Sequence, residues 1–474
     1  MAVGEYLSSV IERGDAGSAL LAERTVQTLQ HSPVDFIGRK KDIPVVRFPE
    51  NKEVVVHTAV GCQDLKNPTE IAASLVDSLT EDAYRLNAIP VAFANVIDSQ
   101  SGDLKMLENI AEGLVQQSLR HEVAILNGEN AILGNRLTVP FTISGTMVSM
   151  RPSSHKKRKE EGIEYTTFAH NNKPVFLNSD GVGTKTEFYE RNRRFHLGLQ
   201  DSLAMKMDDA VKLGAEVKVV ADVVQTRGSI SMDKLGKYAE TLSMQYGCKY
   251  VLYHEPNAPI SGYGHSNLNI AGTAVSLVDE KILDRLHPQE GNVVLALRGQ
   301  PNPRSNGISA KRENMEKILG KEWHKETLGK IFLQYLATPS TVFYPVCKKL
   351  MDQDCATAFF HMSGGAYKGK LAHLLAKERL FVQLKNLFPP DWRELALAGF
   401  SLMPSEVAYA QWPMGNEGFV AVRPDLVKEA CHLIASAGLE SRVVGGLEHA
   451  FNYTGVEFRD VKDSSGRSLY FSGK

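Results

Sequence analysis

The stretch VFLNSDGVG (residues 175–183) decides the fold, because an earlier stretch, VVVHTAVG (residues 54–61), begins the same series of segments. In both series the stretch is followed by a helical segment, a short apolar strand, a second helix and two further strands. Matching landmarks lie at a nearly constant interval, which is 127 positions from Asp82 to Asp209, 126 from Glu129 to Glu255 and 127 from Gly145 to Gly272. A constant interval between separate landmarks indicates one module that is present twice.

Composition places the chain among globular proteins that act on small molecules. Its 474 residues are enough for about three domains of ~150 residues. A hydrophobic content of 43% with 23% charged residues is typical of a globular protein. The net charge of −1 creates no field that would attract nucleic acid or an anionic membrane. With no long apolar run and acidic residues near the start, we expect a cytoplasmic protein without a membrane span.

The order of segments predicts five parts. These are an N-terminal helical segment (1–42), a first copy of the module (43–150), a linker (151–173), a second copy (174–289) and a distinct C-terminal domain (290–474). Alternation of strands and helices within the copies is typical of α/β or α+β domains. The linker carries a basic KKRK cluster, which is either a solvated loop or a phosphate-binding or nuclear-targeting segment.

The loop DGVGTKT (residues 180–186) follows an apolar strand and has the composition of a phosphate-binding loop. Gly181 and Gly183 allow the backbone to turn tightly and to present N–H groups, while Thr184 and Lys185 add a hydroxyl group and a positive charge. The spacing is not that of a Walker A loop. Because an ordinary turn between a strand and a helix has a similar composition, the surrounding residues must decide between the two readings.

Carboxylates accompany this loop. Asp201 opens the next helix, Asp209 lies about two helical turns further on, and Asp222 stands in the apolar strand VVADVV. A carboxylate in an apolar strand requires a charged partner or a metal ion. Asp180, Asp201, Asp209 and Asp222 together predict magnesium bound with nucleotide oxygens. Asp201 taken alone is equally explained as a helix N-cap.

The two copies complement each other. The first copy lacks three of the four acids, with Thr58 in place of Asp180, Ser74 in place of Asp201 and Asn95 in place of Asp222. It carries NGENA (residues 127–131) where the second copy reads HEPNA, so a glycine that permits close approach of a ligand occurs only in the first copy. One working site that uses both copies is the simplest consequence.

Several motifs resemble one family. DGVGTKT, DSLAMKMDDAVKLGAE (201–216), NGENA, NPRSNG (302–307) and HMSGGA (361–366) are similar to the motifs of aminoimidazole ribonucleotide (AIR) synthetase, also called phosphoribosylformylglycinamidine cyclo-ligase, over about residues 43–460. The resemblance implies an α+β, AIR-synthetase-like fold, in which two tandem N-terminal-type α/β domains form an internal pseudo-dimer barrel beside a C-terminal α+β domain. It implies ATP and Mg²⁺ as cofactors and a chain that is a monomer or a homodimer.

The resemblance also implies roles for individual residues. The ATP and phosphate contacts would be Gly181, Gly183 and Thr184 of the second copy and Gly128, Glu129 and Asn130 of the first. The catalytic residues would be Asp180, Lys185 and His361. The substrate contacts would be Ser305, Asn306, Gly307, His361, Ser363 and Gly364. The metal ligands would be Asp180, Asp201, Asp209 and Asp222.

The implied reaction is the ATP-dependent cyclisation of formylglycinamidine ribonucleotide, a phosphoribosyl amidine, to AIR, with release of ADP and phosphate. Departures from the family motifs affect the substrate more than ATP. Asn127 and Asn130 replace a glycine and a threonine, Pro413 replaces an asparagine, and Ala366 replaces the last glycine of the HMSGGA segment. The alternatives are a kinase or ligase of the same superfamily that acts on another small substrate, and a catalytically degenerate nucleotide-binding assembly protein.

Overall fold

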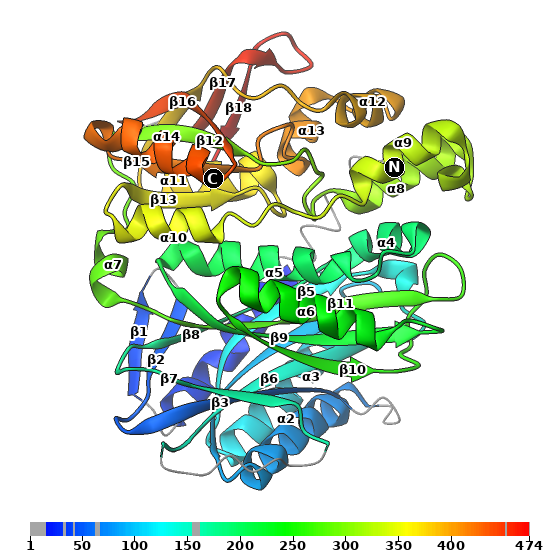
Figure 1. The fold of residues 1–474 in the computed structure, drawn as a ribbon, viewed down its shortest axis with the longest axis vertical. Helices are drawn as coiled ribbons and strands as arrows, with labels where there is room; N and C mark the ends of the chain where they lie inside the picture. Colours follow the sequence, from blue (N-terminus) through cyan, green and yellow to red (C-terminus); the bar gives the residue numbers. More distant parts are fainter. Residues whose placement is uncertain are drawn as a thin grey trace. The chain divides into compact units, whose positions relative to one another are not determined.

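The computed structural model describes residues 16–31, 35–40, 43–61, 67–153, 162–450 and 453–473. These residues divide into an N-terminal unit, 16–206 with 215–280, and a C-terminal unit, 207–214 with 281–473 (Figure 1). The KKRK cluster lies outside the described residues. Of the predicted N-terminal helical segment, residues 16–25 are helical, but residues 35–40 form a strand, so that prediction is wrong in its last part.

The first sheet of the N-terminal unit holds the strands predicted for the first copy. Its order is β5-β4-β6-β3-β7. The strands are β3 (Lys52–Val60), β4 (Ile89–Ser99), β5 (Ala124–Ile132), β6 (Phe141–Pro152) and β7 (Tyr165–Ala169), and the helices are α2 (Pro68–Arg85) and α3 (Leu104–Arg120). Asn67 and Asp103 begin the two helices, because each side chain accepts a hydrogen bond from a backbone N–H group of the first turn.

The second sheet holds the strands of the second copy, in the order β1-β2-β8-β11-β9-β10. The strands are β1 (Asp35–Lys40), β2 (Ile43–Arg47), β8 (Val175–Gly181), β9 (Glu216–Arg227), β10 (Lys249–Glu255) and β11 (Asn267–Leu277). The helices are α4 (Thr186–Asn192), α5 (Leu197–Ala210) and α6 (Met232–Tyr246). The last residues of α5, from Met207 on, are grouped with the C-terminal unit.

The two sheets share one topology. The four strands β5-β4-β6-β3 correspond one by one to β10-β9-β11-β8, with the same parallel and antiparallel pairings. Asn95 lies opposite Gly145 in the first sheet, and Asp222 lies opposite Gly272 in the second. These two glycines, which the sequence interval had matched, therefore occupy equivalent positions.

Strand register corrects two of the other equivalences. Asp180 pairs with Gly272 and Ala59 pairs with Gly145, so Ala59 rather than Thr58 stands at the position of Asp180. In β5 the register shifts between the partners of Phe93 and Ala94, and Gly128 comes to lie opposite Asn95. Leu252 lies opposite Asp222, so the counterpart of Gly128 is Leu252 and not a residue of HEPNA.

Edge strands are exchanged between the two sheets. Strand β2, at the start of the range predicted for the first copy, pairs with β8 of the second sheet, through Val45 opposite Phe176. Strand β7, which precedes the second copy, pairs with β3 of the first sheet. The segment predicted to be a linker therefore contributes a strand. The exchange ties the two copies together at both edges.

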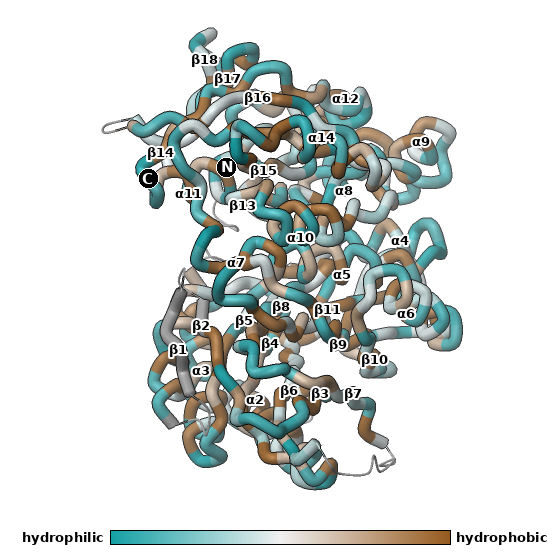
Figure 2. The backbone as a smooth tube through the Cα atoms, turned by 60° about the vertical axis from the view of Figure 1, so that its left-hand side comes forward, coloured by the Kyte–Doolittle hydropathy of each residue, from teal (hydrophilic) through white to brown (hydrophobic). Residues whose placement is uncertain are grey.

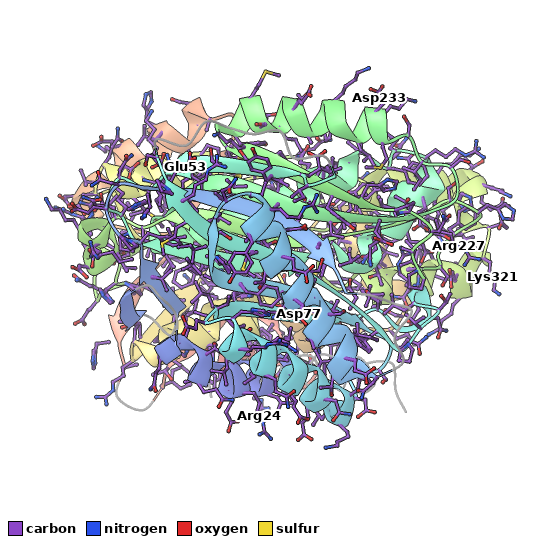
Figure 3. The ribbon with its side chains drawn as sticks, turned by 90° about the horizontal axis from the view of Figure 1, so that it is seen from below. Arg24, Glu53, Asp77, Arg227, Asp233 and Lys321 are labelled. Carbon is purple, nitrogen blue, oxygen red and sulfur yellow. The ribbon has the colours of Figure 1, made fainter. Side chains whose placement is uncertain are left out.

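The two sheets bury a common apolar core. It contains Val54, Ala94 and Leu126 of the first sheet together with Leu177 and Val219 of the second. Figure 3 shows α2, which carries Asp77, below the sheets and α6, which begins beside Asp233, above them, so the helices cover the outer faces. The strands between them include many of the brown, hydrophobic stretches in Figure 2. Because both inner faces are apolar, neither sheet could remain exposed to water alone.

The C-terminal unit is a mixed sheet with helices. The strand order is β13-β15-β12-β16-β14-β17-β18. The strands are β12 (Val293–Arg298), β13 (Ala356–His361), β14 (Leu380–Leu384), β15 (Gly418–Val422), β16 (Glu440–His449), β17 (Gly455–Lys462) and β18 (Ser468–Ser472). The helices are α8 (Ile308–Leu319), α9 (Thr327–Leu336), α10 (Tyr344–Asp352), α11 (His373–Lys377), α12 (Trp392–Phe400), α13 (Ser405–Gln411) and α14 (Val427–Ser436), while α7 (Glu280–Arg285) begins at the boundary between the units. Within the described ranges, every helix is too short or too polar to cross a membrane.

The shared core gives a first prediction. Replacing Leu177, which is fully buried in β8, by Ala should lower the free energy of unfolding by about 2–5 kcal/mol, because it leaves a cavity between the sheets. The matched control is Leu104→Ala in α3, whose side chain is 47% exposed and which should change stability by no more than about 0.5 kcal/mol. Urea unfolding of both variants measures the difference, and equal small effects would contradict a shared core.

Candidate functional site

The DGVGTKT loop begins where β8 ends. Asp180 is partly exposed, and its Oδ1 accepts a hydrogen bond from Gly181 N at 2.7 Å. Gly183 has a φ of 63°, a conformation that glycine adopts without strain. The hydroxyl of Thr186 donates to Gly183 O at 2.9 Å and fixes the entry into α4. The sharp turn therefore depends on a glycine at position 183, as a loop that offers N–H groups to an anion requires.

The first copy contributes to the strand that leads into this loop. Asn127 of β5 accepts a hydrogen bond from Ser179 N, with 2.9 Å between its Oδ1 and that nitrogen. Gly128, Glu129 and Asn130 follow Asn127 in β5, and a Cβ atom at Gly128 would lie 3.1 Å from Asn95 Oδ1. Asn127, one of the departures from the family motif, thus joins the NGENA segment to the second copy.

Arg136 forms a second connection between the copies, which sequence reasoning missed. It ends the short helix η2 (Gly134–Arg136) of the first copy and is 4% exposed. One terminal nitrogen, Nη2, lies 2.9 Å from Thr186 Oγ1, 2.8 Å from Glu190 Oε1 and 2.9 Å from Leu268 O, all in the second copy. Its Nε and Nη1 have no hydrogen-bond partner among the described residues. Because Glu190 and Glu187 of α4 balance its charge, Arg136 serves as a buried link between the copies beside the loop.

Lys185 and Asp201 form a buried ion pair. Their side chains are fully buried, with 2.9 Å between Lys185 Nζ and Asp201 Oδ1, and Tyr189 donates its hydroxyl to Asp201 Oδ2. Burial raises the pKa of the Tyr189 phenol well above its ordinary value, and the Asp201 carboxylate raises it further. Because α5 begins at Leu197, Asp201 lies inside the helix, so the prediction that it opens the helix is wrong and the N-cap alternative is excluded.

Asp222 and Lys206 form an equivalent pair. Lys206 Nζ lies 2.6 Å from Asp222 Oδ1, and both side chains are fully buried. Ser202 donates to the same carboxylate oxygen at 3.1 Å, and the Tyr250 hydroxyl donates to Asp222 Oδ2 at 2.5 Å. The expectation that a carboxylate in this strand needs a partner is met by a lysine. The sequence signal for it was Lys206 within the otherwise apolar run LAMKM (residues 203–207).

The structure does not bring the four predicted metal ligands together. Asp201 and Asp222 each have a lysine as counter-ion, and Asp209 belongs to the C-terminal unit. Over the ranges that the structure describes, no group of three or more His, Cys, Asp and Glu side chains is arranged to hold a metal ion. Carboxylates that already carry a buried ammonium group do not fit a magnesium site, because two cations would compete for the same oxygens.

Thr58 and Ser74, which the sequence had matched to Asp180 and Asp201, form local hydrogen bonds. Thr58 donates its hydroxyl to Gly145 O at 2.7 Å, and Ser74 donates to Ile71 O at 2.8 Å. Thr58 also lies 3.4 Å from the hydroxyl of Thr146, just as Ser179 lies 2.9 Å from that of Thr273 in the second sheet. The equivalent hydroxyl pairs support the corrected register.

In the C-terminal unit, the imidazole of His361 lies between the guanidinium of Arg304 and the carboxylate of Asp209. His361 ends β13 and is fully buried, with its Nε2 2.9 Å from Asp209 Oδ1 and its Nδ1 3.2 Å from Arg304 Nη2. Burial lowers the pKa of His361 to about 3, while Lys212 beside Asp209 keeps the pKa of that carboxyl low despite its own burial. The hydrogen bonds fix the neutral tautomer that donates from Nε2 to Asp209 and accepts at Nδ1 from Arg304.

Two predicted substrate segments meet around this histidine. Ser363 Oγ lies 3.1 Å from His361 Nε2, and Asn306 donates its amide to Ser363 O at 2.7 Å. Asp208 accepts from Arg304 at 3.0 Å and from the backbone N–H groups of Phe343 and Tyr344. The NPRSNG and HMSGGA segments are therefore neighbours.

The backbone conformation at the ends of the NPRSNG and HMSGGA segments shows which residues positions 307 and 366 can accommodate. Gly307 has a φ of 61°, and any side chain there would collide with Trp412. Gly364 has open space around it, while Ala366 has a φ of 38°, a conformation that costs an alanine energy and that glycine would adopt freely. Ala366, which replaces a glycine of the family motif, is thus held in a strained backbone conformation.

Asp98, at the seam between the two copies, was also missed. It lies in β4, is 4% exposed, and its Oδ2 accepts from Asn269 Nδ2 of the second sheet at 2.7 Å. Burial raises its pKa to about 6, although Asn269 and Arg136 oppose that shift. A carboxylate in an apolar strand needs a partner. The sequence signal that singled out Asp222 was therefore present at Asp98 as well.

Comparison with known proteins agrees with the motifs. Residues 40–150 match the family described as "AIR synthase related protein, N-terminal domain". The chain is 28% identical over 284 residues to a phosphoribosylformylglycinamidine cyclo-ligase of Anaeromyxobacter dehalogenans, and 24% identical over 281 residues to that of Clostridium perfringens. Each alignment covers 58% of this chain and 81% of the relative. A thiamine-monophosphate kinase structure from Stenotrophomonas maltophilia shares 16% identity at a TM-score of 0.46, covering 65% of this chain and 90% of that one.

The buried pairs give a second prediction. Lys206→Met should lower the free energy of unfolding by about 3–5 kcal/mol, because it leaves the Asp222 carboxylate buried without a counter-ion. The double variant Lys206→Met with Asp222→Asn should recover most of this loss in urea unfolding. A single variant as stable as the unmodified chain would contradict the pairing.

Asp98 gives a third prediction. Because its folded pKa of about 6 exceeds the unfolded value of 3.8, its contribution to stability is present below about pH 4 and is lost as the pH rises through 6. Asp98→Asn should therefore be more stable than the unmodified chain at pH 8, by up to about 3 kcal/mol, and equally stable near pH 4. Unfolding curves across this range test the prediction, and a constant difference at every pH would contradict it.

With its motifs and these relatives in agreement, the chain resembles the AIR synthetases, and residues 40–150 match the N-terminal domain of AIR synthase related proteins.

Proposed function

We propose that this chain is an ATP-dependent enzyme of the AIR synthetase type that cyclises formylglycinamidine ribonucleotide to AIR. The hydrogen bond between Asn127 of the first copy and Ser179 N of the second carries the proposal, because it ties NGENA to the strand that ends in DGVGTKT. One ATP site would then be built from DGVGTKT of the second copy and NGENA of the first. The counterpart segments, VVVHTAVG of the first copy and HEPNA of the second, would bind no ATP. The 81% of each cyclo-ligase relative that the chain covers supports this assignment.

In the proposed reaction the protein mainly positions groups and neutralises charge. ATP transfers its terminal phosphoryl group to the formyl amide oxygen of the substrate and leaves as ADP. The amidine nitrogen then attacks the activated carbon, phosphate departs with that oxygen, and the imidazole closes. The backbone N–H groups of residues 181–183 and the Thr184 hydroxyl would bind phosphate oxygens. Lys185, whose ammonium is held by Asp201, would hold the loop in position under these oxygens.

The C-terminal unit would supply the contacts to the phosphoribosyl amidine. Ser305, Asn306 and Gly307 would bind it together with Ser363 and Gly364, as the family motifs imply. His361 would donate its Nε2 proton to Asp209. Because the pKa of its imidazole is low, the ring stays neutral near pH 7. Magnesium would enter with ATP, with Asp180 as the remaining predicted carboxylate in the loop, and no step of the proposal depends on it.

One observation favours a second candidate, a nucleotide-binding protein without turnover. Asp201 and Asp222 are already neutralised by Lys185 and Lys206, so the second copy lacks the free carboxylates that a multi-metal phosphoryl-transfer site uses. Under this alternative the chain would bind ATP and release no ADP. A kinase or ligase that acts on another small substrate would release ADP only with that substrate.

ADP release tests the proposal. With Mg-ATP the purified chain should release ADP only when formylglycinamidine ribonucleotide is present, with one imidazole formed per ADP. Asp180→Asn should lower this turnover at least ~100-fold, because the loop loses its carboxylate. The control Asp82→Asn removes a carboxylate that is paired with Arg85 in α2 and should leave turnover within about two-fold.

The outcomes separate the three functions. ATP binding without ADP release would contradict both enzyme candidates, and ADP release without imidazole would point to a different acceptor. Equal loss of turnover in the two variants would contradict the placement of the site in the second copy.

A further inference from the structure

Helix α12 presents an apolar face to solvent in addition to the face that it buries. Leu397 and Ala398 are buried on one side of the helix. The outward residues have the spacing of one helical stripe and carry no charge, namely Trp392, Leu395, Ala396, Gly399 and Phe400. Trp392 is 56% exposed and Leu395 is 50% exposed. A helix that is apolar on two faces is typical of an element that is covered on both sides.

The apolar surface continues from α12 onto α9, its neighbour in the C-terminal unit (Figure 1). The ring centroid of Phe332, a buried residue of α9, lies 5.8 Å from that of Trp392 and 6.0 Å from that of Phe400. Fourteen large apolar residues are exposed in the described part of the chain, and six of them gather here. We call these six the α9–α12 patch, which consists of Leu328, Ile331, Trp392, Leu395, Phe400 and Leu402. Together they expose roughly 600 Å² of apolar surface, as much as the largest patches of monomeric proteins, which are often functional.

Leu402 gives a second, independent indication that this patch is covered. It follows Ser401, the C-cap residue of α12, has a φ of 50° and is 89% exposed. Helices commonly end on a glycine in this left-handed conformation, because a side chain costs energy there. Leu402 is therefore unfavourable in its backbone conformation and gains almost no burial within its own chain. Both properties are explained if another molecule buries this side chain.

The charges of α12 do not favour a charged partner, because they are already paired. Arg393 Nε and Nη2 each lie 2.7 Å from a carboxylate oxygen of Asp391. Glu394 is buried, with its Oε1 3.1 Å from Lys311 Nζ. Binding to this helix would therefore come from apolar contact. The whole chain carries a net charge of −1, so two copies do not repel each other strongly, and a second apolar patch of the same kind is the best-suited partner.

We propose that two copies of this chain associate through the α9–α12 patch, with their α12 helices antiparallel across a two-fold axis at Ala396. The residue order along α12 is self-complementary, because small residues separate two aromatic ones. An axis at Ala396 places Trp392 of each copy against Gly399 and Phe400 of the other, so a large residue meets a small one at both ends. A Cβ atom at Gly399 would meet nothing within 4 Å, so there is open space for that indole ring.

The size of the patch agrees with a reversible dimer. Two such patches would bury roughly 1,200 Å² in total, which is the lower limit of stable protein–protein interfaces. Trp392 would be the central anchor, since tryptophan is enriched among the residues that dominate binding energy. The patch contains none of the residues assigned to ATP, metal or substrate, so the inference stands whichever reaction the chain performs.

Sedimentation equilibrium of the full chain measures the association. The chain should form a reversible dimer, and Trp392→Ala should weaken it at least about 30-fold. Gly399→Glu should weaken it at least about ten-fold, because a charge then lies in the apolar contact. Leu402→Gly should weaken it about three-fold or more, yet should not lower the thermal unfolding midpoint of dilute, monomeric chain, since glycine adopts this φ freely. The matched controls are Gly236→Glu in α6, where a Cβ atom also meets open space, and Arg379→Gly, an exposed residue with a φ of 55° after α11; both should leave the dissociation constant within about two-fold.

Disulfide formation tests the orientation of the two copies. The variant Ala396→Cys places a thiol on the two-fold axis, so mild oxidation should link two copies, whereas Gly236→Cys should stay unlinked. A chain that is still monomeric at about 100 µM would overturn the proposal. A dimer with an unchanged dissociation constant in both Gly399→Glu and Leu402→Gly would overturn it as well. A dimer that these variants weaken, but in which Ala396→Cys forms no disulfide, would overturn the antiparallel arrangement.

Discussion

The N-terminal unit depends on one constraint: each of its two sheets has an apolar inner face that the other sheet must cover. Val54 and Leu126 of the first sheet belong to the same core as Leu177 and Val219 of the second. Strands β2 and β7 reinforce this dependence, because each pairs with the sheet of the other copy. A module that needs a partner to bury its core thus has that partner within the same chain, and the seam between the copies is fixed in register.

The fixed seam has chemical consequences. Asn127 bonds to the strand that ends in the glycine-rich loop, and Arg136 reaches across to the first turn of α4. Charges that would be costly in such an interior occur as pairs, Lys185 with Asp201 and Lys206 with Asp222. Each pair joins two elements of the second copy, so these charges hold the loop, α5 and β9 in place. Their role as a scaffold explains why the acids do not gather around a single metal ion.

Much of the fold could be predicted from the sequence, because repeated spacing and apolar strands are visible there. The equivalence of Gly145 and Gly272 is confirmed by their strand partners. The shift of register in β5 was not predictable, since the extra residue falls in the continuous apolar run of residues 124–126, which has no alternation that would reveal it. The strand at residues 165–169 was missed, because it pairs with a segment more than a hundred residues away and its five residues stand in an otherwise polar stretch.

The site was also predicted only in part, because motifs are visible in the sequence and contacts between distant segments are not. The NPRSNG and HMSGGA segments meet around His361, and β8, which leads into the loop, is hydrogen-bonded to the first copy. The partners of buried charges were not predictable, because a carboxylate in an apolar strand has the same sequence signal whether a lysine or a metal ion compensates it. Arg136 was missed, because its partners lie about 50 residues or more further along the chain.

The central claim is that the two copies build one nucleotide site between them. Equilibrium binding of a non-hydrolysable ATP analogue to the full chain and to Asn127→Ala measures it most directly. The account predicts one analogue per chain and an affinity at least ten-fold weaker in Asn127→Ala, since the first copy then no longer holds the strand of the loop. Two analogues per chain, or one bound with unchanged affinity in Asn127→Ala, would contradict it.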